Sequence, residues 1–208
     1  MEVQPQLVDS PPSPTSICSQ GPRQVLIETF IQQHIRNHFS GSRVVEAPSI
    51  RSYKWRNTVA ASDLLIELLD VWTPEAAGQR PAVLIRANDE SSQRISIGDA
   101  HHSPGDLTAF GRYSDLVLGS VTVFCLSTQG GEAGVLAGEV WRELKFFAPI
   151  IRAQLGLLRF VSTQKGRIMK VKEAKDHWGV PLTFAYGFEE IWTLRQQTPK
   201  ITSIELST

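Results

Sequence analysis

Apolar residues between Gly130 and Leu157 recur at intervals of three and four, which is the spacing of one face of an α-helix. The stripe comprises Leu136, Val140, Leu144, Phe147, Ile151 and Leu155. Pro149 interrupts it, because proline donates no backbone hydrogen bond and disfavours helical angles at the residue before it. The pattern therefore predicts one helix from about Glu132 to Ala148, and a second, short helix that begins at Pro149 and ends at Gly156.

The charged residues of the first of these helices fall mostly on the side away from the apolar stripe, where we expect solvent to surround them. They are Glu139, Arg142, Glu143 and Lys145. The apolar stripe needs a flat surface on which to pack. Runs typical of β-strands lie on each side of the segment, from Asp115 to Thr128 and from Leu158 to Thr163. The pattern therefore predicts a strand, helix, strand core.

A second amphipathic helix is predicted from Pro22 to Phe39, with Gly41 as its stop signal. Its apolar face would comprise Leu26, Ile27, Phe30, Ile31, Ile35 and Phe39. The preceding stretch, 1–21, is rich in proline and serine and carries too little apolar surface to offset the entropy of ordering. We therefore expect a flexible arm over 1–21 that orders only on a partner, followed by a single domain over 22–208.

Shorter apolar runs predict further strands. The run from Leu64 to Trp72 fits a helix or a strand, and its short length and the Thr-Pro break after it favour a strand. Pro81 to Ala87 and Arg94 to Gly98 flank a polar stretch and are predicted to form the two arms of a hairpin. In the strand from Asp115 to Thr128, apolar residues occur at both parities, so both of its faces need cover. We therefore expect this strand to be central in its sheet.

One long strand is predicted from Val180 to Leu194, because apolar residues share one parity along it and only Glu190 interrupts them. At ~3.3 Å per residue it would measure about 50 Å. We expect it to bend near Gly187 and to overhang its sheet, where it must be guarded or pair with another chain. Its first half should pair within the chain, with Phe184 packed on the central helix. The elements together predict an α+β fold, with a mixed, mainly antiparallel sheet packed by a long central helix and an N-terminal helix.

Aromatic residues at two places are candidates for contacts between subunits. Phe188 and Trp192 lie in the second half of the long strand, and aromatic anchors next to a charge are typical of an interface core and its rim. Tyr53 and Trp55 alternate with basic residues in the segment 42–57. Such a mixture can bind nucleic acid or line a subunit contact. The equal numbers of basic and acidic residues, 21 each, favour the subunit contact.

Composition narrows the compartments that suit the chain. A neutral chain has no global field to attract DNA or an anionic membrane. Cys18 lies in the polar leader and Cys125 in an apolar strand, which is a poor arrangement for a disulfide and favours a reducing compartment. The sequence has neither an apolar signal core near its start nor a run of about eighteen apolar residues. We therefore expect neither secretion nor membrane insertion.

Two groups of histidines are candidates for metal or acid–base chemistry. His34 and His38 have the i, i+4 spacing with which two imidazoles share a zinc ion, but isoleucine stands where a zincin has its general-base glutamate. Asp99, His101 and His102 cluster in a predicted loop, where they could bind a metal or transfer protons, although a solvated polar loop is the more common situation. We expect no catalytic site, no metal and no cofactor.

The order of the predicted elements and four phrases of the sequence provide a further comparison. The phrases are WTPEAAGQRPAVLIR, GSVTVFCLS, EAGVLAGEVWRELKFFAPIIR and GLLRFV, and with the long strand they cover most of the chain from Ser62 to Leu206. They resemble tail-terminator or neck proteins of tailed bacteriophages. The leader and the segment 42–57 lie outside the resemblance, and the shared phrases are packing patterns with no catalytic signature.

The resemblance implies a virion structural protein, a hexameric ring that ends the phage tail tube and joins it to the head connector. Its partners would be copies of itself, a head-side connector or stopper protein, and the tail tube, with the sheath where one is present. DNA would only pass through the lumen, and assembly would occur in the cytoplasm of the host bacterium. A stopper or head-completion protein is the alternative within virions. A metal-dependent hydrolase using Asp99, His101 and His102 is the alternative from another class.

Overall fold

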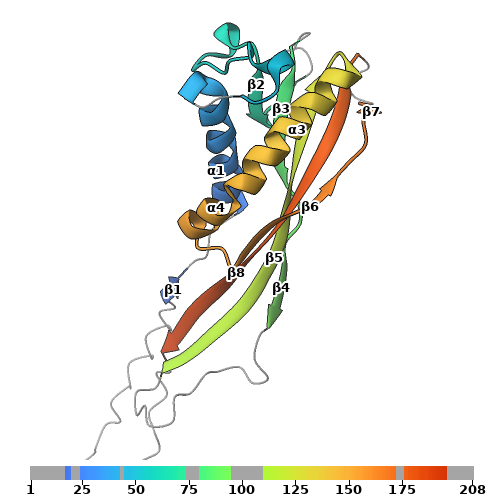
Figure 1. Ribbon diagram of the computed structural model, residues 1–208. Coiled ribbons are helices and arrows are strands. Elements are labelled where there is room, and N and C mark those ends of the chain that lie inside the picture. Colours follow the sequence, from blue (N-terminus) through green and yellow to red (C-terminus); the bar gives the residue numbers. More distant parts are fainter. Residues whose placement is uncertain are drawn as a thin grey trace, which may run out of the picture.

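Two antiparallel strands of 18 residues each, β5 (Phe110–Ser127) and β8 (Trp178–Arg195), form the axis of the molecule (Figure 1). They pair along their whole length, from Phe110 opposite Arg195 to Ser127 opposite Trp178. The computed structural model describes residues 17–19, 24–42, 45–73, 80–94, 110–171 and 176–195. Within these ranges, the other strands are added on either side of the β5–β8 ribbon.

Shorter strands complete a mixed sheet of eight strands, in the order β1-β8-β5-β3-β2. They are β1 (Ile17–Ser19), β2 (Leu65–Leu68), β3 (Ala82–Ala87), β4 (Ser91–Arg94), β6 (Arg159–Lys165) and β7 (Met169–Lys170). β4 pairs with β5, while β6 and β7 pair with β8. Only the pairing of β2 with β3 is parallel among the described strands. The predicted α+β class with a mainly antiparallel sheet is confirmed.

Helices cover one face of this sheet (Figure 1). α1 (Gln24–Asn37) contacts β2 and β3, α3 (Gly130–Phe146) contacts β5 and β8, and α4 (Ala148–Leu155) contacts β6. Alternation along the strands supplies the covered face with buried apolar side chains. From the two long strands these include Val121, Val123, Cys125, Val180, Leu182 and Phe184. As predicted, β5 is central, between β8 on one side and β3 and β4 on the other.

The predicted break at Pro149 is confirmed. α3 ends at Phe146, and Pro149 lies in the first turn of α4, where the missing N–H costs no helical hydrogen bond. α4 ends at Leu155 and is capped by Gly156, whose φ of 64° is left-handed and therefore suits glycine. Both predicted helices are thus present, and α3 begins slightly before its predicted start, at Gly130.

The predicted N-terminal helix is also confirmed, with one error in its apolar face. Ile27 and Ile31 are fully buried, whereas Leu26 is 56% exposed. Each residue turns an α-helix by about 100°, so Leu26 lies to one side of the line that its isoleucine neighbours follow. The helix continues into a π-helical turn over His38–Ser42, in which Gly41 has a φ of 93°.

The predicted hairpin is wrong. β3 and β4 both pair with β5 and not with each other. Ala87 lies opposite Val121 and Ser91 lies opposite Leu118, so the two strands follow one another along the same edge of β5. The polar residues between them interrupt this edge without reversing the chain. Residues 95–98 of the predicted second arm lie outside the described ranges. The favoured strand in the run from Leu64 to Trp72 is confirmed as β2.

The long C-terminal strand is confirmed, and strands of the same chain pair with both of its edges. β5 lies along one edge of β8, and β7, β6 and β1 pair in turn with the other edge. The pairing with β1 corrects the prediction that the leader orders only on a partner, because Ile17–Ser19 pairs with Ile191 to Thr193 of the same chain. The remainder of the leader lies outside the described ranges. Beyond the helices, the lower part of the ribbon is flanked by β1 and β4 (Figure 1).

The predicted packing of Phe184 on the central helix is confirmed. Its side chain is fully buried, and its ring centre lies 5.2 Å from that of Trp141 on α3. It also stacks on Phe160 of β6, with ring centres 5.5 Å apart and planes 5° from parallel. These three aromatic rings join the helix layer to the middle of the sheet.

Candidate functional site

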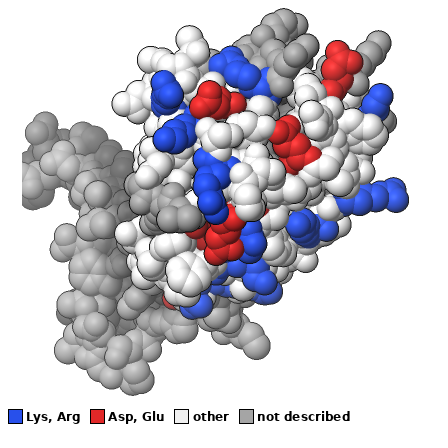
Figure 2. Space-filling view, turned by 45° about the horizontal axis from the view of Figure 1, so that its top comes forward, with Lys and Arg blue, Asp and Glu red and all other residues white. Residues whose placement is uncertain are grey.

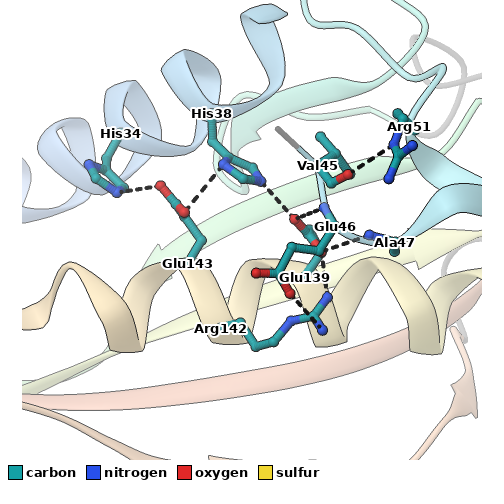
Figure 3. Close-up of polar contacts among 9 residues, drawn as sticks. All are labelled: His34, His38, Val45, Glu46, Ala47, Arg51, Glu139, Arg142 and Glu143. Atoms are coloured by element: carbon teal, nitrogen blue, oxygen red, sulfur yellow. Dashed lines mark hydrogen bonds and ion pairs between the residues drawn. The ribbon is translucent and has the colours of Figure 1, made fainter. Parts of the chain in front are cut away.

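Four titratable side chains meet between α1 and α3. His34 and His38 lie one turn apart on α1 and its π-helical continuation, and Glu139 and Glu143 lie one turn apart on α3, so the two pairs have matching spacings. Glu143 lies 3.1 Å from Nε2 of His34 and 3.2 Å from Nδ1 of His38 (Figure 3). Glu139 lies 3.1 Å from Nε2 of His38. We call these four residues the His–Glu cluster.

The prediction that Glu139 and Glu143 lie in solvent is wrong. Glu139 is 2% exposed and Glu143 is 9% exposed, whereas Arg142 and Lys145 are exposed as predicted. The physical reason is that α3 packs on two neighbours, on the sheet through its apolar stripe and on α1 through an adjacent side. A buried carboxylate requires charged or hydrogen-bonding partners, and here the histidines of α1 provide them.

Glu139 also connects α3 to the loop that follows the π-helical turn. One of its carboxylate oxygens accepts a hydrogen bond from the backbone N–H of Glu46 at 3.0 Å. The other accepts hydrogen bonds from the N–H of Ala47 at 3.4 Å and from Nη2 of Arg142 at 2.6 Å. Arg142 in turn lies 3.1 Å from the Glu46 carboxylate (Figure 3). The buried carboxylate therefore joins the helix α3, the loop and His38.

The contacts within the His–Glu cluster favour the charged forms of His38, Glu139 and Glu143. Burial alone would lower the pKa of His38, but the hydrogen bonds and negative charges of Glu143 and Glu139 outweigh burial and raise that pKa. Burial alone would raise the pKa of Glu139, yet a backbone N–H, Arg142 and His38 together lower it. Burial would also raise the pKa of Glu143, but its contacts with His34 and His38 lower it. An imidazolium between two carboxylates is thus the favoured state of the site.

An open pocket of about 580 Å³ adjoins the cluster. Its buried lining residues are His38, Glu139 and Glu143, and its exposed ones include Lys145 and Phe146. The charges inside are already neutralised by one another, so they offer a small ligand few free groups. The exposed aromatic and basic residues at the surface are more typical of a contact with another protein.

The i, i+4 histidines do not extend into a metal centre. In the part of the chain that the structure describes, no group of three or more His, Cys, Asp and Glu side chains is arranged to hold a metal ion. Both histidines face carboxylates instead. The other predicted group, Asp99, His101 and His102, lies outside the described ranges.

Tyr53 and Trp55, two of the predicted interface residues, are half-buried against their own chain. The segment around them contains the 3₁₀ turns η2 (Pro48–Ile50) and η3 (Val59–Ala61). Tyr53 donates a hydrogen bond to Glu132 in the first turn of α3, and this bond, with burial, raises the pKa of Tyr53 to about 12. The guanidinium carbon of Arg36 lies 4.9 Å from the ring centre of Trp55. These contacts give both rings a structural role within the chain, and their interface role stays a prediction.

Phe188 and Trp192, the other two predicted interface residues, have different outcomes. Phe188 is 5% exposed, and its ring centre lies 6.5 Å from that of Tyr186. It continues the parity of the core residues of β8, so it faces the covered side of the sheet. Its burial gives the ring a structural role within the chain, and its interface role stays a prediction. The backbone of Trp192 lies opposite Tyr113 and Cys18, while its side chain lies outside what the structure describes.

The carboxylate half of the cluster was missed in the sequence, although a signal was present. Glu139 and Glu143 repeat the i, i+4 spacing of His34 and His38, and each stands three residues after a member of the apolar stripe. On a helical projection they therefore border the stripe and do not oppose it. Two acidic residues at the edge of an apolar face, and two histidines with the same spacing on another helix, together predict a buried helix–helix contact.

None of the helices in the described ranges is long and apolar enough to cross a membrane. Comparison with protein-family models and with characterised proteins found no matching family and no relative.

Proposed function

We propose that this chain is a structural protein of the bacteriophage neck, and specifically the tail terminator. It would form a ring of identical subunits that caps the tail tube and joins it to the head connector. The observation that carries the proposal is the β5–β8 ribbon, which continues past the helix layer with β1 and β4 as its only described flanking strands in that part (Figure 1). A subunit that contacts identical neighbours through two different surfaces forms a ring when the rotation between subunits closes, and a projecting ribbon can provide one of those surfaces.

Exposed apolar side chains on the body support a protein that contacts other proteins. Phe146 at the end of α3 is 78% exposed, and Ile150, one turn later on α4, is 48% exposed. Val71, after β2, is 72% exposed. Single exposed apolar residues are common, but an exposed aromatic ring and an exposed isoleucine only four residues apart are typical of an interaction surface.

The distribution of charge supports a ring that surrounds DNA without binding it tightly. The chain carries 21 basic and 21 acidic residues. On the face shown in Figure 2, Lys and Arg side chains are spread over a largely uncharged surface, with fewer Asp and Glu side chains among them. Proteins that grip DNA usually gather positive charge along one continuous stripe, and this face has none. This face would therefore not bind DNA, and DNA would only pass through the lumen of the ring.

The remaining partners follow from the proposed position. One side of the ring would contact a head-side connector or stopper protein, and the other would contact the tail tube and, where present, the sheath. The ring would be hexameric and assemble in the cytoplasm of the infected bacterium. Phe188 is buried within its own chain, whereas Phe146 and Ile150 are exposed, so we take Phe146 and Ile150 as the leading candidates for a subunit contact.

Imaging of phage particles that contain this chain, tagged at one terminus, tests the proposal. We expect a ring of tagged subunits between head and tail. Because neck proteins often assemble only on a template, a monomer in free solution would be compatible with the proposal. A single copy per particle, or a tag found anywhere other than the neck, would contradict it.

The variant Phe146→Glu sharpens this test. It should keep the thermal midpoint of the subunit, since the ring is exposed, and lower the fraction of particles that carry a complete neck. Gln154→Glu is the matched control, because Gln154 is an exposed residue of α4 and gains the same charge. Equal assembly of the two variants would show that Phe146 takes no part in the ring.

A further inference from the structure

The sheet face opposite the helices carries a second, smaller apolar cluster. Its buried members are Leu65, Ala82, Leu84 and Leu126, and the half-buried Leu69, Trp72, Phe124 and Val171 pack against them. These residues have the opposite parity to Val83 and Val123, which face the helices. None of the described helices contacts this second cluster, because α1, α3 and α4 all lie on the other face.

A groove of about 660 Å³ runs over this cluster, from the end of β2 to β7. Leu84, Phe124 and Leu126 line it from β3 and β5, and Gly179 and Pro181 line it from β8. A Cβ atom at Gly179 would lie 2.9 Å from Cδ2 of Leu126, so the glycine allows the strands to pack closely beneath the groove. A preformed apolar groove of this size suits a chain segment or one large side chain.

The polar side chains that line the groove, those of Trp72, Arg86 and Lys170, carry hydrogen-bond donors or positive charge. Arg86 and Lys170 line it, and no Asp or Glu does so among the described residues. Nε1 of Trp72 is buried and has no hydrogen-bond partner in the described part of the chain. Nζ of Lys170 lies 5.6 Å from the ring centre of Trp178, and no carboxylate of the described residues pairs with it. A buried donor without an acceptor is costly, so a ligand that brings acceptors would be favoured.

We propose that this groove binds an apolar segment that carries carboxylates, supplied by a neighbouring protein. Leucine-like side chains would cover the apolar lining, while carboxylates would pair with Arg86 and Lys170 and an acceptor would meet the indole N–H of Trp72. The inference rests on the proposed function in one respect, since the neighbour would be the head-side or tail-side protein of the neck. It names the chemistry of that docking face.

A second copy of this chain is a poorer occupant. The apolar ridge that we assign to subunit contacts consists of Phe146 and Ile150, and Lys145 and Arg152 are exposed on the same two helices. Docking that ridge would bring these cations toward Arg86 and Lys170, and like charges brought together weaken binding. Charge therefore selects an acidic partner for the groove and assigns contacts between copies to another surface.

Two labelled synthetic peptides test the proposal on the full-length protein, by fluorescence anisotropy at low and physiological salt. One peptide contains leucine and glutamate, and the other is identical except that lysine replaces each glutamate. We expect the acidic peptide to bind at least about tenfold more tightly than the basic one, with the difference shrinking as salt rises. The double variant Arg86→Glu, Lys170→Glu should weaken the acidic peptide by about tenfold or more and strengthen the basic one.

The double variant Lys145→Glu, Arg152→Glu is the matched control, because it makes the same charge change on the helix-covered face. It should leave the affinity of the acidic peptide within about twofold. Equal binding of the two peptides, binding of neither, or an equal loss in both double variants would overturn the proposal. So would a single-stranded oligonucleotide that competes with the peptide and depends on the same two cations. Peptide binding tests the groove alone, whereas imaging of the tagged chain in particles tests the neck position. A groove that binds no acidic peptide can therefore be distinguished from a chain that is not in the neck.

Discussion

The two sides of α3 are both buried, but different forces bury them. One side presents Leu136 and Leu144, fully buried against the sheet, where apolar contact is non-directional and insensitive to pH. The other side presents Glu139 and Glu143 to the histidines of α1. There each carboxylate is buried only because a specific partner meets it at hydrogen-bonding distance.

This difference has a consequence for specificity. An apolar face tolerates small shifts of a helix along the sheet, whereas a pair of charges separated by one turn matches its partners in one register only. The apolar side of α3 therefore supplies most of the stabilisation, and the His–Glu cluster fixes where α1 and the loop after it lie relative to α3. Breaking the two sides separately distinguishes these roles.

The largest expected effect is on the apolar side. Phe184→Ala removes a fully buried ring that contacts Trp141 and Phe160, and it should lower the free energy of unfolding by about 3–5 kcal/mol. Urea denaturation followed by circular dichroism measures this loss. Phe146→Ala is the matched control, because it removes the same ring from a site that is 78% exposed, and it should cost less than about 0.5 kcal/mol. Similar midpoints for the two variants would show that the aromatic contact does not stabilise the sheet.

The next effect is on the polar side. His38→Leu keeps most of the side-chain volume but leaves Glu139 and Glu143 buried without their shared cation, and it should cost about 3 kcal/mol. Adding Glu143→Leu removes one of the stranded charges. The double variant should therefore be more stable than the sum of the two single losses predicts, by at least about 1 kcal/mol. Additive losses would mean that the two residues are not coupled.

The pH dependence of the free energy of unfolding distinguishes the apolar and polar sides of α3 without any mutation. The folded pKa of His38 is raised above 6.5, so its contribution is complete below pH 6.5 and is lost as the pH rises through the folded value. The folded pKa values of Glu139 and Glu143 are lowered below 4.5, so their contributions are present above pH 4.5 and are lost as the pH falls through the folded values. The cluster should therefore stabilise the fold most between pH 4.5 and 6.5.

Urea denaturation at several pH values measures this window. The slope on each side should approach about 1.4 kcal/mol per pH unit for each group that titrates. Two further charged groups face the cluster, because Arg142 lies 2.6 Å from Glu139 and Glu46 lies 3.1 Å from Arg142. The alkaline slope should disappear in His38→Leu and persist in Phe184→Ala. A wild-type alkaline slope that survives His38→Leu would assign it to another residue.

The same contrast explains how far the sequence predicts the structure. Apolar periodicity predicted α1, α3, α4, β5 and β8, because burial of a stripe on a sheet depends on residues within one element. The hairpin and the solvent exposure of Glu139 were wrong, because each depended on a partner from elsewhere in the chain. β3 and β4 meet β5 across a long sequence separation, and Glu139 meets His38 of another helix. Pairings of this kind leave a weak local signal.

The smallest expected loss of stability comes from the half-buried hydrogen bond between Tyr53 and Glu132, in the first turn of α3. Tyr53→Phe keeps the ring and removes the hydroxyl that donates to Glu132, so it should cost about 0.5–1.5 kcal/mol. The raised pKa of Tyr53, about 12, should also be measurable as a late ultraviolet titration, and Tyr53→Phe should remove that component. A melting midpoint that is unchanged in Tyr53→Phe, together with a loss of complete necks in assembled particles, would contradict a stabilising role of this hydroxyl within the chain. It would instead support the prediction that Tyr53 contacts a neighbouring subunit, because the hydroxyl would then matter for assembly and not for folding.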